Sequence, residues 1–218
     1  MISPSEDGEV ILVDKPLEWT SFDVVKKIRG TYRLKKVGHA GTLDPLATGL
    51  LIVCTGKKTK QIESFMGLVK EYTGTMEIGK TTPSVDLETE FDSESDWSMI
   101  TEEVCHSATE PFIGDILQVP PLFSAVKIKG QRAYELARQG KKTKLAPRHV
   151  NVSEFQLTKI ELPVIEFLIV CSKGTYIRSI VRDFGEKIGT GAYMKSLRRT
   201  KIGTHSVEHA ITIDQIHR

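Results

Sequence analysis

Short segments of strand length recur along the whole chain, and helical segments lie between them instead of forming a separate block. Apolar spacing typical of helices is clearest near residues 21–32 and 176–188. Strand-like patterns cover six segments: 9–14, 50–55, 70–78, 151–160, 164–172 and 197–203. This order predicts a mixed domain that contains both helices and strands.

The two longer helical segments have recognisable ends. The first, near Ser21–Tyr32, begins with a Thr20-x-x-Asp23 pattern typical of a capping box. We expect its inward face to consist of Phe22, Val25 and Ile28. The second, from about Tyr176 to Ile188, is followed by Gly189, a common helix stop. Its expected inward residues are Ile177, Ile180, Val181, Phe184 and Ile188.

The composition is that of a folded protein. The 218 residues include 30 Lys and Arg, 28 Asp and Glu, and 39% hydrophobic residues, enough apolar content for a packed core. No apolar run approaches the roughly 20 residues that a membrane-spanning helix needs. The amino-terminal segment lacks the basic and apolar regions of a secretion signal, so we expect a cytoplasmic protein.

The cysteines give no sign of a disulfide framework or a zinc site. Cys54, Cys105 and Cys171 are odd in number, far apart, and free of any C-x-x-C spacing. We therefore predict three buried thiols.

Charge is distributed unevenly: residues 1–109 contain 12 basic and 18 acidic side chains, whereas residues 110–218 contain 18 and 10. The basic excess lies between residues 127 and 148, around a short helix predicted for Gln131–Arg138 that ends at Gly140. This stretch fits either nucleic-acid contact or a lysine-rich surface. The acidic run is interpreted as a solvated loop that leads into a helix: Asp86, Glu88, Glu90, Asp92, Glu94, Asp96, Glu102 and Glu103.

The segment Gly38–Leu51 is the most informative for function, because it combines three glycines, a histidine and a single acid, Asp44. Glycine permits positive φ angles and the close approach of a ligand, and Pro45 fixes the turn directly after the acid. We expect a rigid loop before a buried strand. Its aspartate is either a functional carboxylate or a cap for backbone N–H groups.

Two cofactor-dependent chemistries are not supported. Gly56-Lys57 resembles the end of a phosphate-binding loop, but position 51 is not glycine and position 58 is neither serine nor threonine. His39 and Asp44 form only a pair, without a third ligand at metal spacing. The sequence therefore predicts no nucleotide cofactor and no metal.

The segment from Gly38 to Leu51 resembles the catalytic motif G-H-x-G-x-L-D-P-x-A-T-G-x-L of the TruB family of tRNA pseudouridine synthases. Further segments resemble the family's other motifs and occur in the family's order. They are Val13–Pro16, Lys70–Tyr72, Val119–Lys127 with Arg132–Arg138, Cys171–Arg178, and Leu197–Arg199. The resemblance covers nearly the whole chain.

This resemblance implies an α+β fold, the pseudouridine synthase catalytic fold, whose central mixed and largely antiparallel sheet is flanked by helices. It also implies one catalytic domain, residues 1–218, with an RNA-gripping insertion at about 120–150. Many family members continue into a small RNA-binding PUA domain. We expect none here, because the sequence ends shortly after Asp214.

The implied reaction is the isomerisation of uridine to pseudouridine at position 55, in the T-arm of tRNA. The base is flipped out of the RNA, its N-glycosidic bond breaks, and C5 of uracil joins C1′ of ribose. Asp44 is implied as the catalytic carboxylate, acting on either the sugar or the uracil ring. The reaction is redox-neutral and needs no cofactor.

Five other residues are implied to bind the substrate. Arg178 pairs with the catalytic aspartate and keeps it charged as the pocket loses water. Tyr72 stacks on the target uracil. His39 fills the gap that the flipped base leaves, Lys15 supports the tyrosine, and Leu197 packs against the base.

The basic insertion is implied to close on the T-arm and to neutralise its phosphates. The expected partner is tRNA, with no membrane and no nucleotide cofactor, and the protein is expected to be a monomer. The residues implied to bind RNA are Lys127, Lys129, Arg132, Arg138, Lys141 and Lys142.

Two other functions fit parts of the same pattern. A hydrolase or transferase that acts on a nucleoside N-glycosidic bond would also place a carboxylate near a sugar. A protein that binds tRNA and helps it to fold would hold a flipped base with little turnover. The combination of Asp44, Tyr72 and Arg178 favours the active synthase, because function depends on the site and not on the fold alone.

Overall fold

The computed structural model of the protein describes residues 7–124, 126–128, 130–139 and 145–217. Two compact groups of residues are present. Unit 1 comprises residues 1–73 and 197–218, and unit 2 comprises residues 74–196. Two long strands contribute residues to both units.

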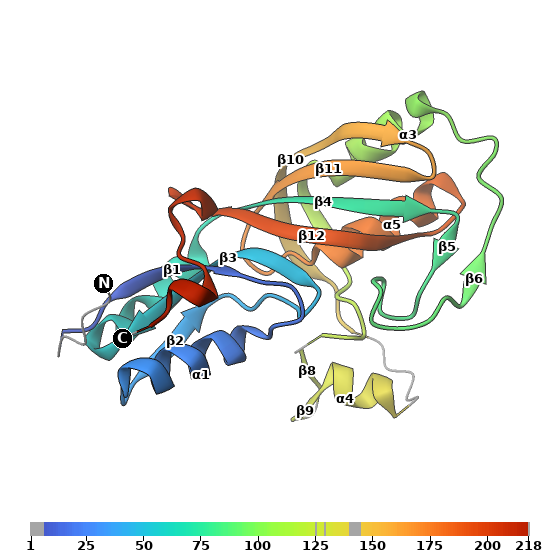
Figure 1. The fold of residues 1–218 in the computed structure, drawn as a ribbon. Helices are drawn as coiled ribbons and strands as arrows, with labels where there is room; N and C mark the ends of the chain where they lie inside the picture. The colour runs from blue at the N-terminus through green and yellow to red at the C-terminus, as the bar shows by residue number, and fades with distance from the viewer. Residues whose placement is uncertain (1–6, 125, 129, 140–144, 218) are drawn as a thin grey trace. The chain divides into compact units, whose positions relative to one another are not determined.

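The strands form a mixed, mostly antiparallel sheet with the hydrogen-bonded order β1-β3-β12-β4-β11-β10-β7 (Figure 1). Strand β2 pairs with β3, and β13 pairs with β12. β12 runs parallel to β3, whereas β1 and β2 run antiparallel to it. The strands are β1 (Val10–Lys15), β2 (Val37–Ala40), β3 (Ala47–Thr55), β4 (Lys70–Ile78), β7 (Gly114–Gln118), β10 (Arg148–Glu161), β11 (Val164–Cys171), β12 (Ala192–Ile202) and β13 (His205–Ser206).

The helices and short pairings complete the described chain. The α-helices are α1 (Ser21–Tyr32), α2 (Ile62–Gly67), α3 (Glu102–Thr109), α4 (Ala133–Arg138) and α5 (Ile177–Ile188). The 3-10 turns are η1 (Gly56–Gln61), η2 (Glu110–Phe112), η3 (Val207–His209) and η4 (Ile213–Gln215). Two small hairpins pair β5 (Lys80–Thr81) with β6 (Ser93–Glu94), and β8 (Lys127–Ile128) with β9 (Gln131–Arg132).

Strand β3 is the centre of unit 1, because both of its faces are buried. Leu51 and Val53 pack with residues of β1 and α1 in one cluster. Leu50 and Ile52 belong to a second cluster on the other face, together with Ile202. A strand covered on both sides can be apolar along almost its whole length, which explains the continuous run from Leu50 to Cys54.

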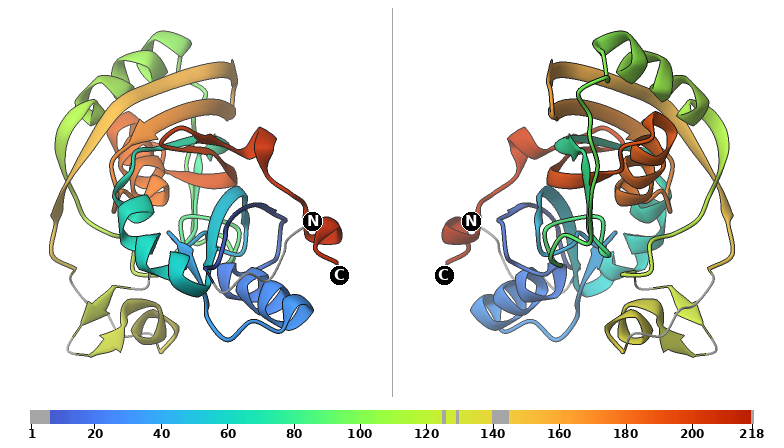
Figure 2. Two further views of the ribbon diagram at one scale, coloured as in Figure 1. Left: turned by 90° about the vertical axis from the view of Figure 1, so that its left-hand side faces the viewer. Right: turned by 90° about the vertical axis from the view of Figure 1, so that its right-hand side faces the viewer.

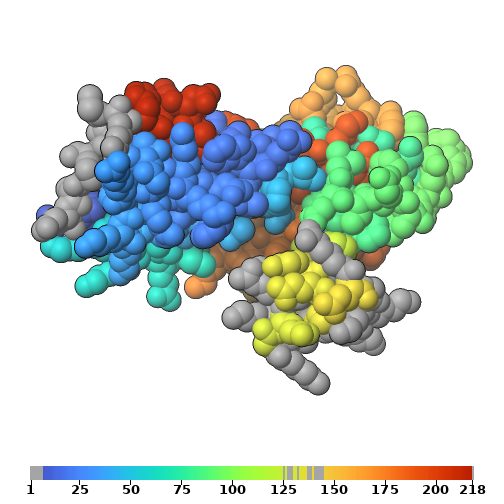
Figure 3. Space-filling view, turned by 60° about the horizontal axis from the view of Figure 1, so that its bottom comes forward, coloured from blue at the N-terminus to red at the C-terminus, as the bar shows by residue number. Residues whose placement is uncertain are grey.

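Helix α1 begins and ends as local rules require. Thr20 and Asp23 form the predicted capping box, and Arg33 closes the helix in a left-handed conformation. The space-filling view shows the helix and the residues after it (blue) on the surface of unit 1 (Figure 3). The predicted inward position of Phe22 is wrong, since this side chain is 53% exposed. The buried face instead consists of Ser21, Val24, Val25, Ile28 and Tyr32.

In unit 2, helices pack on the long hairpin of β10 and β11, which is visible from both sides in Figure 2. The Phe155 ring of β10 makes edge-to-face contacts with the rings of Phe167 on β11 and Phe184 on α5. Helix α5 (Ile177–Ile188) is capped by Gly189 as predicted. Ile177, Ile180, Val181 and Phe184 are buried as predicted, whereas Ile188 is only half-buried. The aromatic cluster therefore fixes α5 against the sheet.

The six predicted strands are confirmed, and β4 has the predicted bounds. The largest change is in β12, which begins at Ala192, five residues before the predicted start. The longer strands that were missed are β2, which falls in the segment predicted as a loop, and β7. The two-residue strands β5, β6, β8, β9 and β13 were missed as well. The predicted helix 131–138 is shorter than expected, because Gln131–Arg132 form β9 and α4 begins at Ala133. Its predicted end at Gly140 lies outside the described residues.

The three cysteine thiols are free and buried, as predicted. In the part of the chain that the structure describes, no helix is long and apolar enough to cross a membrane.

We expect the free energy of unfolding to distinguish two glycines inside helices. A Cβ at Gly185 of α5 would lie 2.2 Å from the Ala192 nitrogen, whereas a Cβ at Gly30 of α1 meets nothing within 4 Å. Gly185→Ala should therefore lower the free energy of unfolding by about 2–3 kcal/mol. Gly30→Ala, the matched control, should leave it unchanged or raise it by up to about 1 kcal/mol. Urea denaturation checks both, and equal effects would contradict this account of the α5 packing.

Candidate active site

Asp44 lies on the loop that joins β2 to β3 in unit 1. The loop begins at Gly41, whose φ of 84° is accessible to glycine at little cost, and Pro45 follows the aspartate. The Ala47 nitrogen donates to the Asp44 carbonyl at 3.0 Å and closes the turn at the start of β3. The Asp44 side chain is half-buried. The predicted position, a tight loop before a buried strand, is confirmed.

Three carbonyl groups of this loop accept hydrogen bonds from other segments of unit 1. Arg199 Nη2 donates to the Gly41 carbonyl at 3.0 Å. The Ser21 hydroxyl accepts from the Leu43 nitrogen at 2.8 Å and donates to the Leu43 carbonyl at 3.2 Å. The Pro45 carbonyl accepts from the backbone nitrogen of Glu18 at 2.9 Å and from Lys15 Nζ at 3.3 Å. The backbone on both sides of the aspartate is therefore held.

Lys15, at the end of β1, is fully buried. Its ammonium group donates to the carbonyls of Pro16, Trp19 and Pro45, which matches its three N–H donors. Burial lowers the pKa of Lys15 to about 8, while the nearby Asp44 carboxylate acts in the opposite direction and Arg199 lowers it further. Lys15 therefore holds the loop of the aspartate; its predicted support of Tyr72 stays a prediction.

Arg199 is the second buried cation of unit 1, with 1% of its surface exposed. Besides Gly41, it donates from Nε to the Leu50 carbonyl at 2.7 Å. Lys15 on β1 and Arg199 on β12 both pair with Gly49 of β3, from opposite sides. A Cβ at Gly49 would lie 2.3 Å from the Arg199 carbonyl oxygen, so only glycine fits between the two strands.

The other predicted residues of unit 1 occupy three strands. His39 lies on β2, and its Nδ1 atom is buried with no hydrogen-bond partner among the described residues. Burial and the charge of Arg199 lower the pKa of His39, so the ring is neutral at pH 7. Leu197 on β12 is 8% exposed and pairs with Ala47, three residues after the aspartate. Tyr72 on β4 is 9% exposed.

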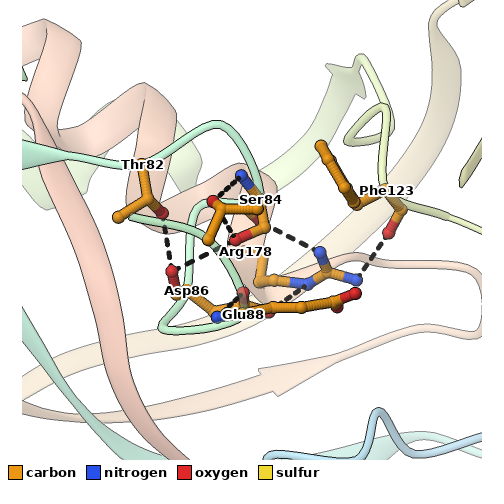
Figure 4. Close-up of polar contacts among 7 residues, drawn as sticks. Thr82, Ser84, Asp86, Glu88, Phe123 and Arg178 are labelled. Atoms are coloured by element: carbon orange, nitrogen blue, oxygen red, sulfur yellow. Dashed lines mark hydrogen bonds and ion pairs between the residues drawn. The ribbon is translucent and has the colours of Figure 1, made fainter. Parts of the chain in front are cut away.

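Arg178 is buried in unit 2 near the start of α5, where the close-up shows its partners (Figure 4). It donates from Nη1 to the Ser84 carbonyl at 2.9 Å and from Nη2 to the Phe123 carbonyl at 2.8 Å. Its Nε lies 3.5 Å from a carboxylate oxygen of Asp86, and both side chains are 4% exposed. The predicted pairing of Arg178 with Asp44 stays a prediction.

The solvated position predicted for Asp86 is wrong, because this residue is buried and ion-paired. Its loop is fixed by short-range bonds: Thr82 Oγ1 and Ser84 Oγ both donate to the Asp86 carbonyl, and the Glu88 nitrogen donates to Asp86 Oδ1 (Figure 4). Val85, which lies between Ser84 and Asp86 in the sequence, has a positive φ of 63°. The rest of the acidic run does lead into a helix, α3.

The predicted RNA-binding residues lie partly within the described chain. Lys127 is on β8, Arg132 on β9 and Arg138 on α4, and β8 and β9 form a hairpin directly before α4. Lys129, Lys141 and Lys142 lie outside the described residues. Among the described residues, no group of three or more His, Cys, Asp or Glu side chains is placed to hold a metal ion.

Comparison with known families identifies this arrangement. Residues 29–177 match the TruB family pseudouridylate synthase (N terminal domain), and residues 178–218 match the tRNA pseudouridylate synthase B C-terminal domain. The chain belongs to the TruB family. Its activity is that of a tRNA pseudouridine synthase, an isomerase.

Curated relatives of this TruB chain extend the match to almost its full length. The tRNA pseudouridine synthase B of Flavobacterium johnsoniae is 50% identical over 97% of this chain and 96% of its own length. That of Chloroherpeton thalassium is 52% identical over 96% of this chain and 89% of its own length.

Solved structures agree with the fold of the TruB chain. The crystal structure of a Cbf5-Nop10-Gar1 complex matches 96% of this chain with a TM-score of 0.73 and 30% identity. An H/ACA RNP bound to a substrate RNA containing 2′-deoxyuridine matches 96% of it with a TM-score of 0.71 and 28% identity. This chain spans about half the length of each of those chains, 54% and 52%. The α+β fold that the sequence predicted is confirmed.

Three residues that contact Arg178 or the Asp44 loop were missed from the sequence. Asp86 was one acid in a run of acids, with no local signal that set it apart. Ser21 was noted only as the start of a helix, although its hydroxyl bonds to Leu43. Arg199 lies in the motif Leu197–Arg199, and the sequence does not show that its side chain is buried against the loop.

The buried ammonium of Lys15 should make stability depend on pH in a defined direction. The pKa of Lys15 is about 8 in the folded protein and 10.5 without burial, so between these values only the unfolded chain keeps the proton. Stability therefore rises with pH across that window. Between about pH 7.5 and about pH 9.5, the wild type should gain about 2 kcal/mol in free energy of unfolding relative to Lys15→Met. Urea denaturation at both pH values checks this, and parallel pH curves would contradict it.

Proposed function

We propose that this TruB synthase converts uridine to pseudouridine at position 55, in the T-arm of tRNA, with Asp44 as the catalytic carboxylate. The supporting observation is the fixed, half-buried position of Asp44 between Leu43 and Pro45, both of which are hydrogen bonded to the segment 15–21. A reacting group gains most when its orientation is set before the substrate binds. The choice of the T-arm rests on the motif resemblance.

The proposed reaction begins with extrusion of the uridine from the RNA, which costs a few kcal/mol of stacking. Tyr72 stacks on the extruded base, and Leu197 packs against it. Asp44 attacks either ribose C1′ or the uracil ring, and the bond between N1 and C1′ breaks. The base turns, C5 bonds to C1′, and the bond between Asp44 and the substrate breaks, which restores the free carboxylate. The C5 hydrogen leaves as a proton, and N1 gains a proton. Product and substrate have the same composition, so no oxidant or cofactor is consumed.

Arg178 is proposed to pair with the catalytic aspartate and keep it ionised in the closed pocket. The guanidinium is oriented in unit 2 by Asp86 and by the Ser84 and Phe123 carbonyls. A planar guanidinium with several fixed partners is held in a defined orientation. His39, half-buried on β2 and neutral at pH 7, is proposed to occupy the gap left in the RNA.

The catalytic proposal is tested with a tRNA transcript that carries tritium at uridine C5. The wild type, without added metal or nucleotide, should release tritium while pseudouridine appears at one T-arm uridine. Asp44→Asn should lower the rate by at least about 1,000-fold and still bind tRNA, because the amide cannot act as a nucleophile. Asp96→Asn, a change of the same kind at an exposed loop residue of unit 2, should leave the rate unchanged.

The same assay separates the alternatives. Release of free uracil would indicate a hydrolase of the N-glycosidic bond. Tight tRNA binding without tritium release would indicate an RNA-binding protein that assists folding. Equal rates for the wild type and Asp44→Asn would show that Asp44 is not the catalytic residue.

The basic insertion is proposed to contact T-arm phosphates. Each phosphate contact releases counterions, so binding should weaken steeply as salt rises. Arg138→Gln should reduce the slope of log K against log salt concentration by about 1. Lys159→Gln is the control and should leave the slope unchanged, because the Lys159 ammonium lies on β10 and pairs with Glu161 at 2.9 Å. Filter binding over a range of salt concentrations checks both, and equal slopes for all three proteins would contradict the contact.

A further inference from the structure

Ser21 links the start of helix α1 to the loop of Asp44. It is the first residue of the helix, is 2% exposed, and lies 22 positions before Leu43 in the sequence. Its hydroxyl accepts from the Leu43 nitrogen at 2.8 Å and donates to the Leu43 carbonyl at 3.2 Å. A hydroxyl has one donor and two acceptor positions, so this single group satisfies both backbone polar groups of Leu43.

These bonds are not needed to start the helix. The capping box of α1 is formed by Thr20 and Asp23, in which the Thr20 hydroxyl accepts from the Asp23 nitrogen at 3.0 Å. The Ser21 hydroxyl instead bonds across to the loop. The Leu43 side chain is 4% exposed, so its backbone groups would be costly to leave without partners.

The residue on the other side of Asp44 is held from the same segment. Pro45 has no N–H, so its carbonyl is its single backbone hydrogen-bonding group. That carbonyl accepts from the Glu18 nitrogen at 2.9 Å and from Lys15 Nζ at 3.3 Å. Glu18 adopts a φ of 64°, which is unusual for a residue with a side chain. The segment 15–21 is therefore hydrogen bonded to the residue immediately before Asp44 and to the residue immediately after it.

We infer that Ser21 is a positioning residue for the isomerisation: its hydroxyl fixes the backbone of Leu43 and so sets the direction of the Asp44 carboxylate. This inference rests on the proposed role of Asp44. Ser21 acts through Leu43 and is nearly inaccessible, so it makes no contact with the RNA. Its loss should lower the rate of the chemical step and leave tRNA affinity intact.

The kinetic test compares Ser21→Ala with Ser64→Ala. Ser64 is an exposed serine of helix α2 whose hydroxyl donates to the Gln61 carbonyl at 2.7 Å, so its removal is a matched change in unit 1. Ser21→Ala should lower kcat by about 10–100-fold, the scale of a small misplacement of a reacting group, with KM within about twofold of the wild type. Ser64→Ala should change neither. Ser21→Thr, which restores the hydroxyl, should recover most of kcat.

A measurement without RNA tests the contact itself. In the free protein, the Leu43 amide hydrogen should exchange at least about tenfold faster in Ser21→Ala than in the wild type, because its acceptor is gone. The Ile52 amide of β3 should exchange at its usual rate. If Ser21→Ala does not fold, Ser21→Cys keeps the side-chain volume with a much weaker acceptor, and the same two readouts apply.

The outcomes separate the two proposals. An unchanged kcat in folded Ser21→Ala, a rise in KM at constant kcat, or an unchanged Leu43 exchange rate would overturn the inference. If the wild type releases no tritium from tRNA, the proposed function fails, and the exchange of Leu43 still reports whether Ser21 fixes the loop.

Discussion

Gly49 lies between two buried cations, and the Asp44 loop of unit 1 depends on how their charges are accommodated. Lys15 on β1 and Arg199 on β12 pair with this glycine from opposite sides of β3. A buried charge is costly unless its polar atoms are hydrogen bonded. Here both cations donate to main-chain carbonyls, including those of Gly41 and Pro45 in the aspartate loop. The two cations fix the conformation of the loop through these hydrogen bonds. The carbonyl groups of the loop in turn lower the free-energy cost of burying the two charges.

In unit 2, the buried charge of Arg178 is stabilised in a related way. Two main-chain carbonyls accept from its guanidinium, and the Asp86 carboxylate supplies the opposite charge. Removing Asp86 alone would leave a buried cation without its neutralising partner. This loss lowers the free energy of unfolding by more than the intact ion pair contributes to it. In both units, a buried cation therefore orders a loop that lies far away in the sequence.

The features that were predicted correctly are those with local determinants. The capping box at Thr20 fixes the start of α1 within a few residues, and alternating residues fix β4. Phe22 was placed inward by its spacing alone, although the helix buries the neighbouring Val24 and Val25. The misplacement of Asp86 has a different cause: its partner Arg178 is 92 positions later, so no local pattern distinguishes it from the solvated acids around it. The motif resemblance located Asp44, but not the hydroxyl and carbonyl contacts that hold it.

The hydrogen bonds that fix the Asp44 loop all lie within unit 1, and they form without RNA. The loop therefore loses its conformational freedom during folding and not in each catalytic cycle. Contacts with the RNA are then free to offset the cost of extruding the uridine, a few kcal/mol. Under the proposed function, residues that never touch the substrate, such as Ser21, set the geometry of the reaction, while the basic insertion contributes to binding. A defect in the first group should appear in kcat, and a defect in the second should appear in the salt dependence of affinity.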